Sequence, residues 1–146
     1  ILVSKDLVLI CDDSEDTQRL LREVLERHGF VARAVSDGRQ VLAVAEKEHP
    51  GLILLDLKMP GLDGYAVLQQ LKRSKDTRDI PVIVITASVA DDKTRRDRAI
   101  ALGAANFMTK PFSIPELVDQ VRKTLESRAA ESQSTEVPSS RRSAKK

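Results

Sequence analysis

The segment LILLDLKMPGLDG, residues 52–64, joins an uninterrupted apolar run to polar and turn-forming residues. Residues 52–55 are all Leu or Ile, which is typical of a strand buried on both faces, because a half-exposed strand would alternate with polar residues. Asp56 follows this run directly and precedes a Pro-Gly pair that favours a turn. The segment therefore predicts a buried strand with a carboxylate at its carboxyl end.

Similar apolar runs recur along the chain and alternate with amphipathic segments. The expected strands lie at residues 7–11, 31–35, 52–55, 82–85 and 106–108, the last being the weakest. Parallel neighbours in a sheet need crossover connections, and the helices that make them cover both faces. We therefore predict a three-layer, doubly wound α/β fold around a five-stranded parallel sheet.

Helix start signals stand between the expected strands. Ser14 is a candidate cap for the first helix, and Asp37 followed by Gln40 predicts a capping box for the second. The last helix has the clearest signature, Ser113 with Glu116 three positions later. The stop signals include Gly29 after the first helix, Pro50 after the second and Gly103 after the fourth.

Length and composition suit one compact domain with an extension, since 41% of the 146 residues are hydrophobic and 32% are charged. We assign residues 1–126 to the domain. Residues 127–146 are rich in Ser and carry five basic and two acidic side chains, which predicts a disordered basic tail or linker. No apolar run approaches the roughly 20 residues of a membrane span. The single cysteine, Cys11, fits a reducing compartment, so we expect a cytoplasmic protein.

Polar residues follow four of the expected strands at the points where the strands end. They are Asp12, Asp13, Asp56, Thr86 and Lys110. The carboxyl ends of parallel strands share one edge of the sheet, where α/β proteins bind ligands. Each residue also has an ordinary interpretation, as a helix cap, a turn former, a strand residue or a surface lysine. Their coincidence at one edge is harder to explain in this way and predicts a shared site.

Three crowded carboxylates would repel one another unless a cation compensates them. Oxygen ligands without His or Cys suit Mg²⁺ or Mn²⁺ rather than zinc. A carboxylate beside such an ion, a lysine and a threonine hydroxyl is a set of groups for phosphoryl transfer, with Asp as the nucleophile. We therefore expect Asp56 to accept a phosphoryl group.

The ordered motifs CDD at 11–13, LLDLKMPGLDG at 54–64, ITAS at 85–88 and NFMTKPF at 106–112 carry a family resemblance. The chain resembles the receiver domain of bacterial two-component response regulators, of the chemotaxis-regulator type, over residues 6 to about 126. The resemblance implies a flavodoxin-like fold with strand order 2-1-3-4-5. It also implies a signalling phosphoacceptor with self-catalysed phosphorylation and dephosphorylation rather than a dedicated enzyme.

The resemblance implies a role for each matching residue. Asp56 is the phosphoacceptor, Asp13 binds Mg²⁺ directly, Asp12 assists through water, and the backbone carbonyl of Lys58 supplies a further ligand. Mn²⁺ is a possible substitute for Mg²⁺.

The phosphate-binding and switch residues are implied in the same way. The Thr86 hydroxyl and the Ala87 amide bind phosphoryl oxygens, Lys110 pairs with the phosphate, and the bond from Lys110 to Pro111 is cis. Phosphorylation should draw Thr86 towards the acceptor and let Phe107 turn inward behind it. Ser88 and Lys58 flank the pocket and are expected to influence how long the phosphate survives.

The expected partners follow from this role. The phosphoryl donor is a histidine kinase or a histidine phosphotransfer protein. The face made by the helix before Gly103, the strand at 106–108 and the helix after Ser113 is expected to contact an output domain or a second copy. That first helix is basic through Lys93, Arg95, Arg96 and Arg98, but acidic residues are interleaved with them. This pattern is typical of a solvated face with local ion pairs, so we expect no direct nucleic-acid binding. We also expect no membrane contact.

Two alternatives stay open. A phosphatase of the haloacid dehalogenase type also combines Asp, Mg²⁺, Thr and Lys, but it needs a second acid where this chain has Lys58. A pseudo-receiver would keep the fold as a protein-interaction module without phosphorylation, and the complete acid set argues against it.

Overall fold

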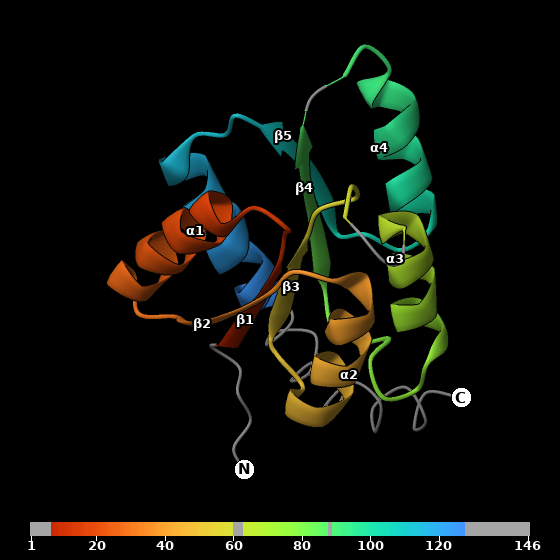
Figure 1. Cartoon of the computed structure of the whole chain (residues 1–146), viewed down its shortest axis with the longest axis horizontal. Coiled ribbons are helices and arrows are strands. Elements are labelled where there is room, and N and C mark those ends of the chain that lie inside the picture. Colours follow the sequence, from red (N-terminus) through yellow and green to blue (C-terminus); the bar gives the residue numbers. More distant parts are fainter. Residues whose placement is uncertain (1–6, 60–62, 88, 128–146) are drawn as a thin grey trace, which may run out of the picture.

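The computed structural model describes residues 7–59, 63–87 and 89–127, and its centre is a five-stranded parallel sheet (Figure 1). The strands are β1 (Leu7–Cys11), β2 (Val31–Val35), β3 (Leu52–Leu55), β4 (Val82–Ala87) and β5 (Asn106–Lys110). They lie side by side in the order β2-β1-β3-β4-β5, and every neighbouring pair is parallel. The predicted fold class and strand order are confirmed.

Two helical layers cover the sheet. The helices are α1 (Glu15–Arg27), α2 (Gly38–Glu48), α3 (Gly64–Arg73), α4 (Asp92–Ala101) and a C-terminal helix over residues 114–127. Figure 1 shows α1 and the C-terminal helix on one face, with α2, α3 and α4 on the other. No helix in the described ranges combines the length and apolar character needed to cross a membrane.

The core consists of two apolar clusters, one on each face of the sheet. Alternate residues of β1 belong to different clusters, because successive side chains of a strand point to opposite faces. Leu9 packs with residues of α2 and α3, whereas Ile10 packs with α1 and the C-terminal helix. Every residue of β1 and of β3 is buried, which is why these strands lack the alternation of a half-exposed sheet.

Strands β4 and β5 are longer than predicted. β4 continues to Ala87 and β5 to Lys110, because Thr86 pairs with Thr109 and Ala87 pairs with Lys110. The polar residues at these positions concealed the strand ends in the sequence. The longer ladder places Thr86 and Lys110 at the same edge of the sheet on neighbouring strands.

The predicted caps begin three of the helices. Ser14 Oγ accepts from the Thr17 amide at 3.2 Å, and Ser113 Oγ accepts from the amide of Glu116 at 3.3 Å. The Asp37 carboxylate also caps α2, with the Arg39 amide as its donor.

The capping box predicted at Asp37 is altered. The side-chain oxygen of Gln40 accepts from the amide of Ser36 at 3.2 Å, one residue before the cap, whereas a standard box would use the amide of Asp37 itself. The prediction that Asp37 caps this helix is therefore confirmed. The predicted return hydrogen bond to Gln40 is wrong by one residue, because its donor is the Ser36 amide.

Helix α4 is anchored differently from the other helices. Ala99 is the one buried residue among the described residues of α4, while the apolar side chain of Ile100 is 44% exposed. The Arg98 guanidinium instead lies 3.9 Å above the centre of the Tyr65 ring on α3. The predicted stop signal Gly103 follows the C-cap residue Leu102 and has a φ of +110°. The burial of apolar side chains therefore contributes little to holding α4 against the sheet.

The predicted domain boundary at residue 126 stays a prediction. Residues 1–6 and nearly all of the predicted tail at 127–146 lie outside the described ranges.

Candidate functional site

Three carboxylates meet at the carboxyl edge of the sheet. Asp12 and Asp13 follow β1, Asp56 follows β3, and one oxygen from each lies within 4.8 Å of the others. The two strands are neighbours, and the Asp56 amide donates to the Cys11 carbonyl at 2.9 Å. Strand pairing therefore brings these acids together, as the sequence predicted.

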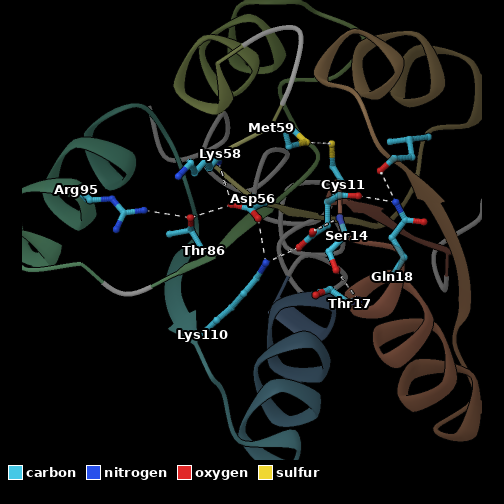
Figure 2. A network of polar contacts seen from close by, with 12 residues as sticks. Cys11, Ser14, Thr17, Gln18, Asp56, Lys58, Met59, Thr86, Arg95 and Lys110 are labelled. Carbon is cyan, nitrogen blue, oxygen red and sulfur yellow. Dashed lines mark hydrogen bonds and ion pairs between the residues drawn. The ribbon is translucent and has the colours of Figure 1, made fainter.

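Lys110 reaches this cluster from the end of β5, as Figure 2 shows. Its Nζ lies 2.6 Å from Asp12 Oδ2 and 3.0 Å from Asp56 Oδ2. The peptide bond from Lys110 to Pro111 is cis, in agreement with the family resemblance. One ammonium group therefore bridges two of the three acids.

Burial and charge shift the pKa values of the bridged groups in ways that follow from their surroundings. Burial raises the pKa of Asp12, and the Lys110 ammonium and the Ser14 amide only partly oppose that rise. Burial by itself would lower the pKa of Lys110, but its hydrogen bonds to Asp12 and Asp56 outweigh this effect, so the pKa of Lys110 is raised. The ammonium is thus held in its charged form and offsets part of the negative charge of the cluster.

Asp56 is 7% exposed, and both of its oxygens have partners. Oδ1 accepts from the Lys58 amide at 3.0 Å and from the Thr86 hydroxyl at 2.8 Å, while Oδ2 accepts from Lys110 (Figure 2). Thr86 is 1% exposed, so its hydroxyl depends on such partners for its hydrogen bonds. The carboxylate is therefore fixed in orientation by donors from three different strand ends.

The donor chemistry of the cluster fits a hard divalent cation. Within the described part of the chain the cluster offers carboxylate oxygens only, and Asp13 is exposed to solvent. Oxygen ligands of this kind suit Mg²⁺ or Mn²⁺. Three acids compensated by one lysine also leave an excess of negative charge for a cation to balance.

Cys11 lies next to this cluster and takes no part in its chemistry. The thiol is buried and donates to Met59 Sδ at 2.9 Å. Burial raises the pKa of the thiol, and the negative charges of Asp12 and Asp56 raise it further. A thiol held protonated in this way is a poor nucleophile and a poor metal ligand, so Cys11 acts as a small core residue.

Arg95 on α4 is the contact that sequence reasoning missed. Its Nη2 donates to Thr86 Oγ1 at 3.1 Å, its Nη1 donates to the Ala87 carbonyl at 2.9 Å, and its guanidinium carbon lies 6.0 Å from the centre of the Phe107 ring. The interleaved charges of α4 predicted that Arg95 lies on a solvated basic face. Helical periodicity cannot reveal such a contact, because it depends on the path of the loop between β4 and α4.

The remaining predicted residues lie as follows. Phe107 is buried in the cluster beneath α3 and α4, and its switch role stays a prediction. Lys58 contacts Asp56 through its amide, and the ligand role of its carbonyl stays a prediction. Ala87 is exposed at the end of β4, and its phosphate-binding role also stays a prediction. Ser88 lies outside the described residues.

Comparison with known proteins identifies the family. Residues 8–122 match the family described as the response regulator receiver domain. Because this match covers most of the chain, the protein belongs to the receiver-domain family of response regulators. The resemblance stated from the four motifs is confirmed.

Curated relatives extend beyond the matched region. The transcriptional regulatory protein HprR of Escherichia coli is 41% identical over 118 residues, which cover 81% of this chain and 51% of HprR. The probable transcriptional regulator ycf27 of Porphyridium aerugineum is 37% identical over 123 residues, covering 84% of this chain and 49% of that protein. The chain thus spans about half the length of these relatives.

Solved structures share the fold. The signal receiver domain of a signal transduction histidine kinase from Syntrophus aciditrophicus is 33% identical with a TM-score of 0.76, and the match covers 83% of this chain and 90% of that one. NtrX from Brucella abortus is 27% identical with a TM-score of 0.81, and the match covers 90% of this chain but 29% of that one. Similar domains therefore occur both in a histidine kinase and within the longer chain of NtrX.

Proposed function

We propose that this receiver domain accepts a phosphoryl group on Asp56 and alters its surface in response. The observation that supports the proposal most directly is the environment of Asp56, a carboxylate oriented by Thr86, Lys58 and Lys110 beside two further acids. A carboxylate held in this way is a preformed nucleophile, and donors around it can stabilise charge on a transferring phosphoryl group.

In the proposed reaction an Asp56 oxygen forms a bond to the phosphorus of a phosphohistidine, and the phosphorus–nitrogen bond breaks. The imidazole nitrogen keeps the electron pair of that bond and takes up a proton. Dephosphorylation ends the signal. A water molecule attacks the phosphorus, the bond between phosphorus and the Asp56 oxygen breaks, and inorganic phosphate leaves the restored carboxylate. The Lys110 ammonium and the Thr86 hydroxyl, each within 3.0 Å of an Asp56 oxygen, are the groups placed to bind the new negative charge.

Asp12, Asp13 and Asp56 are the residues that would hold Mg²⁺, or Mn²⁺ in its place, together with the Lys58 carbonyl implied by the family. When bound, the ion would neutralise charge on the phosphoryl oxygens.

The proposed switch involves Thr86 and Phe107. Two observations support this part of the proposal: the Thr86 hydroxyl donates to Asp56, and the Phe107 ring is buried close to it in the sheet. A phosphoryl group on Asp56 would add acceptor oxygens beside the hydroxyl and strengthen that arrangement. The face formed by α4, β5 and the C-terminal helix lies next to these residues and is the proposed output surface.

The proposed donor is a histidine kinase or a histidine phosphotransfer protein in the cytoplasm. The output is proposed to be a partner, a second copy or a domain outside the matched region. The relatives named as transcriptional regulators favour control of transcription, and similarity to a receiver within a histidine kinase favours a place in a phosphorelay.

Incubation with acetyl phosphate and Mg²⁺ tests this function. We expect the chain to gain about 80 Da, the mass of one phosphoryl group, and expect the Asp56→Asn variant to gain nothing. Rapid turnover of phosphomonoesters would instead support the phosphatase alternative. No adduct with acetyl phosphate or with a phosphohistidine donor would support the pseudo-receiver.

A further inference from the structure

Among the interactions described, it is the Arg95 side chain that connects helix α4 to the site. Among the described residues of α4, Ala99 alone is buried, so polar contacts contribute much of what holds this helix to the sheet. The Arg95 side chain is 21% exposed although it is charged, which means that it is largely enclosed by its neighbours. Such enclosure is unusual for an arginine without specific partners.

The partners of Arg95 lie on two elements, the end of β4 and the start of α4 itself. Its Nη1 contacts the Ala87 carbonyl at 2.9 Å and Asp92 Oδ1 at 3.2 Å, and its Nη2 contacts Thr86 Oγ1 at 3.1 Å. Figure 2 shows the guanidinium on the side of Thr86 opposite to Asp56. The planar fork of an arginine suits such divided contacts, whereas a lysine presents a single point charge.

The Thr86 hydroxyl can donate one hydrogen and accept through its lone pairs, and this fixes the direction of its two hydrogen bonds. Thr86 has one hydrogen to donate, and it donates to Asp56 Oδ1 at 2.8 Å. Arg95 is a donor only, so it must occupy a lone pair of the same oxygen. Because Arg95 occupies a lone pair of the Thr86 oxygen, the Thr86 hydrogen is directed to the Asp56 carboxylate. The positive charge of Arg95 also polarises the hydroxyl and so strengthens its hydrogen bond to Asp56.

We propose that Arg95 is a positioning residue that holds the Thr86 hydroxyl towards Asp56 and thereby links the placement of helix α4 to the phosphoacceptor. The structural part of this inference stands on the contacts alone. Its consequence for phosphorylation rests on the function proposed above. Arg95 acts through Thr86 and has no contact with Asp56 among the interactions described.

The test uses the whole 146-residue chain and two substitutions, Arg95→Ala and Arg95→Lys. Arg96→Ala is the matched control, because Arg96 is an exposed arginine on the same helix. The first readout is the Thr86 hydroxyl proton in a low-temperature NMR spectrum, where a hydroxyl held in two hydrogen bonds exchanges slowly with water. We expect this signal in the wild type and in Arg96→Ala, its loss in Arg95→Ala, and partial retention in Arg95→Lys.

The second readout is a double-mutant cycle on the rate of labelling by acetyl phosphate. Arg95→Ala should slow labelling about fivefold, the size expected for one net hydrogen bond. In a Thr86→Ala background the same substitution should change the rate by less than about twofold, because the partner through which it acts is gone. Arg96→Ala should leave the rate unchanged in both backgrounds.

Two results would overturn the inference. One is an unchanged Thr86 hydroxyl signal in Arg95→Ala, and the other is an equal rate loss in the presence and absence of the Thr86 hydroxyl. Failure of the wild type to become labelled would count against the proposed function only, since the NMR signal would still decide the role of Arg95.

Discussion

At the scale of single residues, the three acids of the cluster differ in exposure, and this difference separates their contributions to stability. Asp12 and Asp56 are buried and share Lys110, whereas Asp13 is exposed and lies within 4.8 Å of both. Asp13 therefore adds repulsion to the cluster without a described ion pair to offset it.

The substitution Asp13→Ala should abolish Mg²⁺-dependent labelling while leaving the free energy of unfolding unchanged or higher by up to about 1 kcal/mol. The physical reason is that removing one carboxylate relieves repulsion but removes a proposed ligand of the cation. Urea denaturation without Mg²⁺, paired with labelling by acetyl phosphate, measures both quantities. Clear destabilisation of this variant would contradict the account of the cluster.

The position of the site could be predicted because the ends of β1 and β3 are visible in the sequence, whereas polar residues concealed the exact ends of β4 and β5. Asp12, Asp13 and Asp56 directly follow apolar runs, and parallel pairing brings them to the edge that Lys110 also reaches. Their individual hydrogen bonds were beyond sequence reasoning. The donation from Lys58 to Asp56, for example, depends on the local path of the loop after β3.

At the scale of elements, the start of α3 packs closely against the backbone of the loop that carries Asp56. A Cβ added at Gly64 would lie 2.4 Å from Leu57 Cα and 2.9 Å from the Asp56 carbonyl oxygen. No side chain fits at these distances. Because Gly64 has none, helix α3 can begin directly against the loop that carries Asp56.

Gly64→Ala should therefore destabilise the domain by about 1–3 kcal/mol, the range for overpacking in a rigid environment. The clash is with backbone atoms, which cannot rotate away as a flexible side chain would. Thermal or urea unfolding measures the effect, with Gln69→Ala on the exposed side of the same helix as the control. Equal stability of Gly64→Ala and the control would show that this close approach does not exist.

The cap of α2 provides a pH-dependent test. The hydrogen bonds from the Arg39 side chain and amide lower the pKa of Asp37, so its carboxylate contributes stability above the pKa of the unfolded chain and loses it as pH falls through the lower, folded pKa. Asp37→Asn keeps an oxygen that can cap the helix but removes the charge. The stability advantage of the wild type over this variant should shrink as pH falls below about 4, and a constant difference down to pH 2 would contradict the assignment.

The elements themselves were predicted well where periodicity and caps agreed, and less well where polar residues enter a strand. β1, β2 and β3 agree with their predicted ranges, whereas β4 and β5 extend beyond theirs into Ala87 and Lys110. In α4 the basic residues suggested a solvated face, but Arg95 and Arg98 make specific contacts with Thr86 and Tyr65. Composition cannot separate these two uses of arginine.

At the scale of the whole molecule, one sheet separates two apolar clusters, and the site lies at the edge that both share. Leu9 belongs to the cluster under α2 and α3, and Ile10 belongs to the cluster under α1 and the C-terminal helix. Both side chains are fully buried. The two layers are therefore coupled through the same central strand.

Leu9→Ala and Ile10→Ala should each lower the free energy of unfolding by about 2–5 kcal/mol, because each leaves a cavity in a closely packed core. Both variants should still unfold in a single transition, since neither helical layer has a core without the sheet. Far-UV circular dichroism and tyrosine fluorescence during urea denaturation check this together. Separate transitions for the two signals would indicate layers that fold independently.

The identity of the carboxylate that becomes phosphorylated is the central claim. Asp12, Asp13 and Asp56 lie within 4.8 Å of one another, but Asp56 alone has donors from Thr86, Lys58 and Lys110 around it. Mass spectrometric mapping of peptides from the chain labelled with acetyl phosphate and Mg²⁺ measures the position directly. The account predicts the phosphoryl group on Asp56, and a label on Asp12 or Asp13 in the wild-type chain would contradict it.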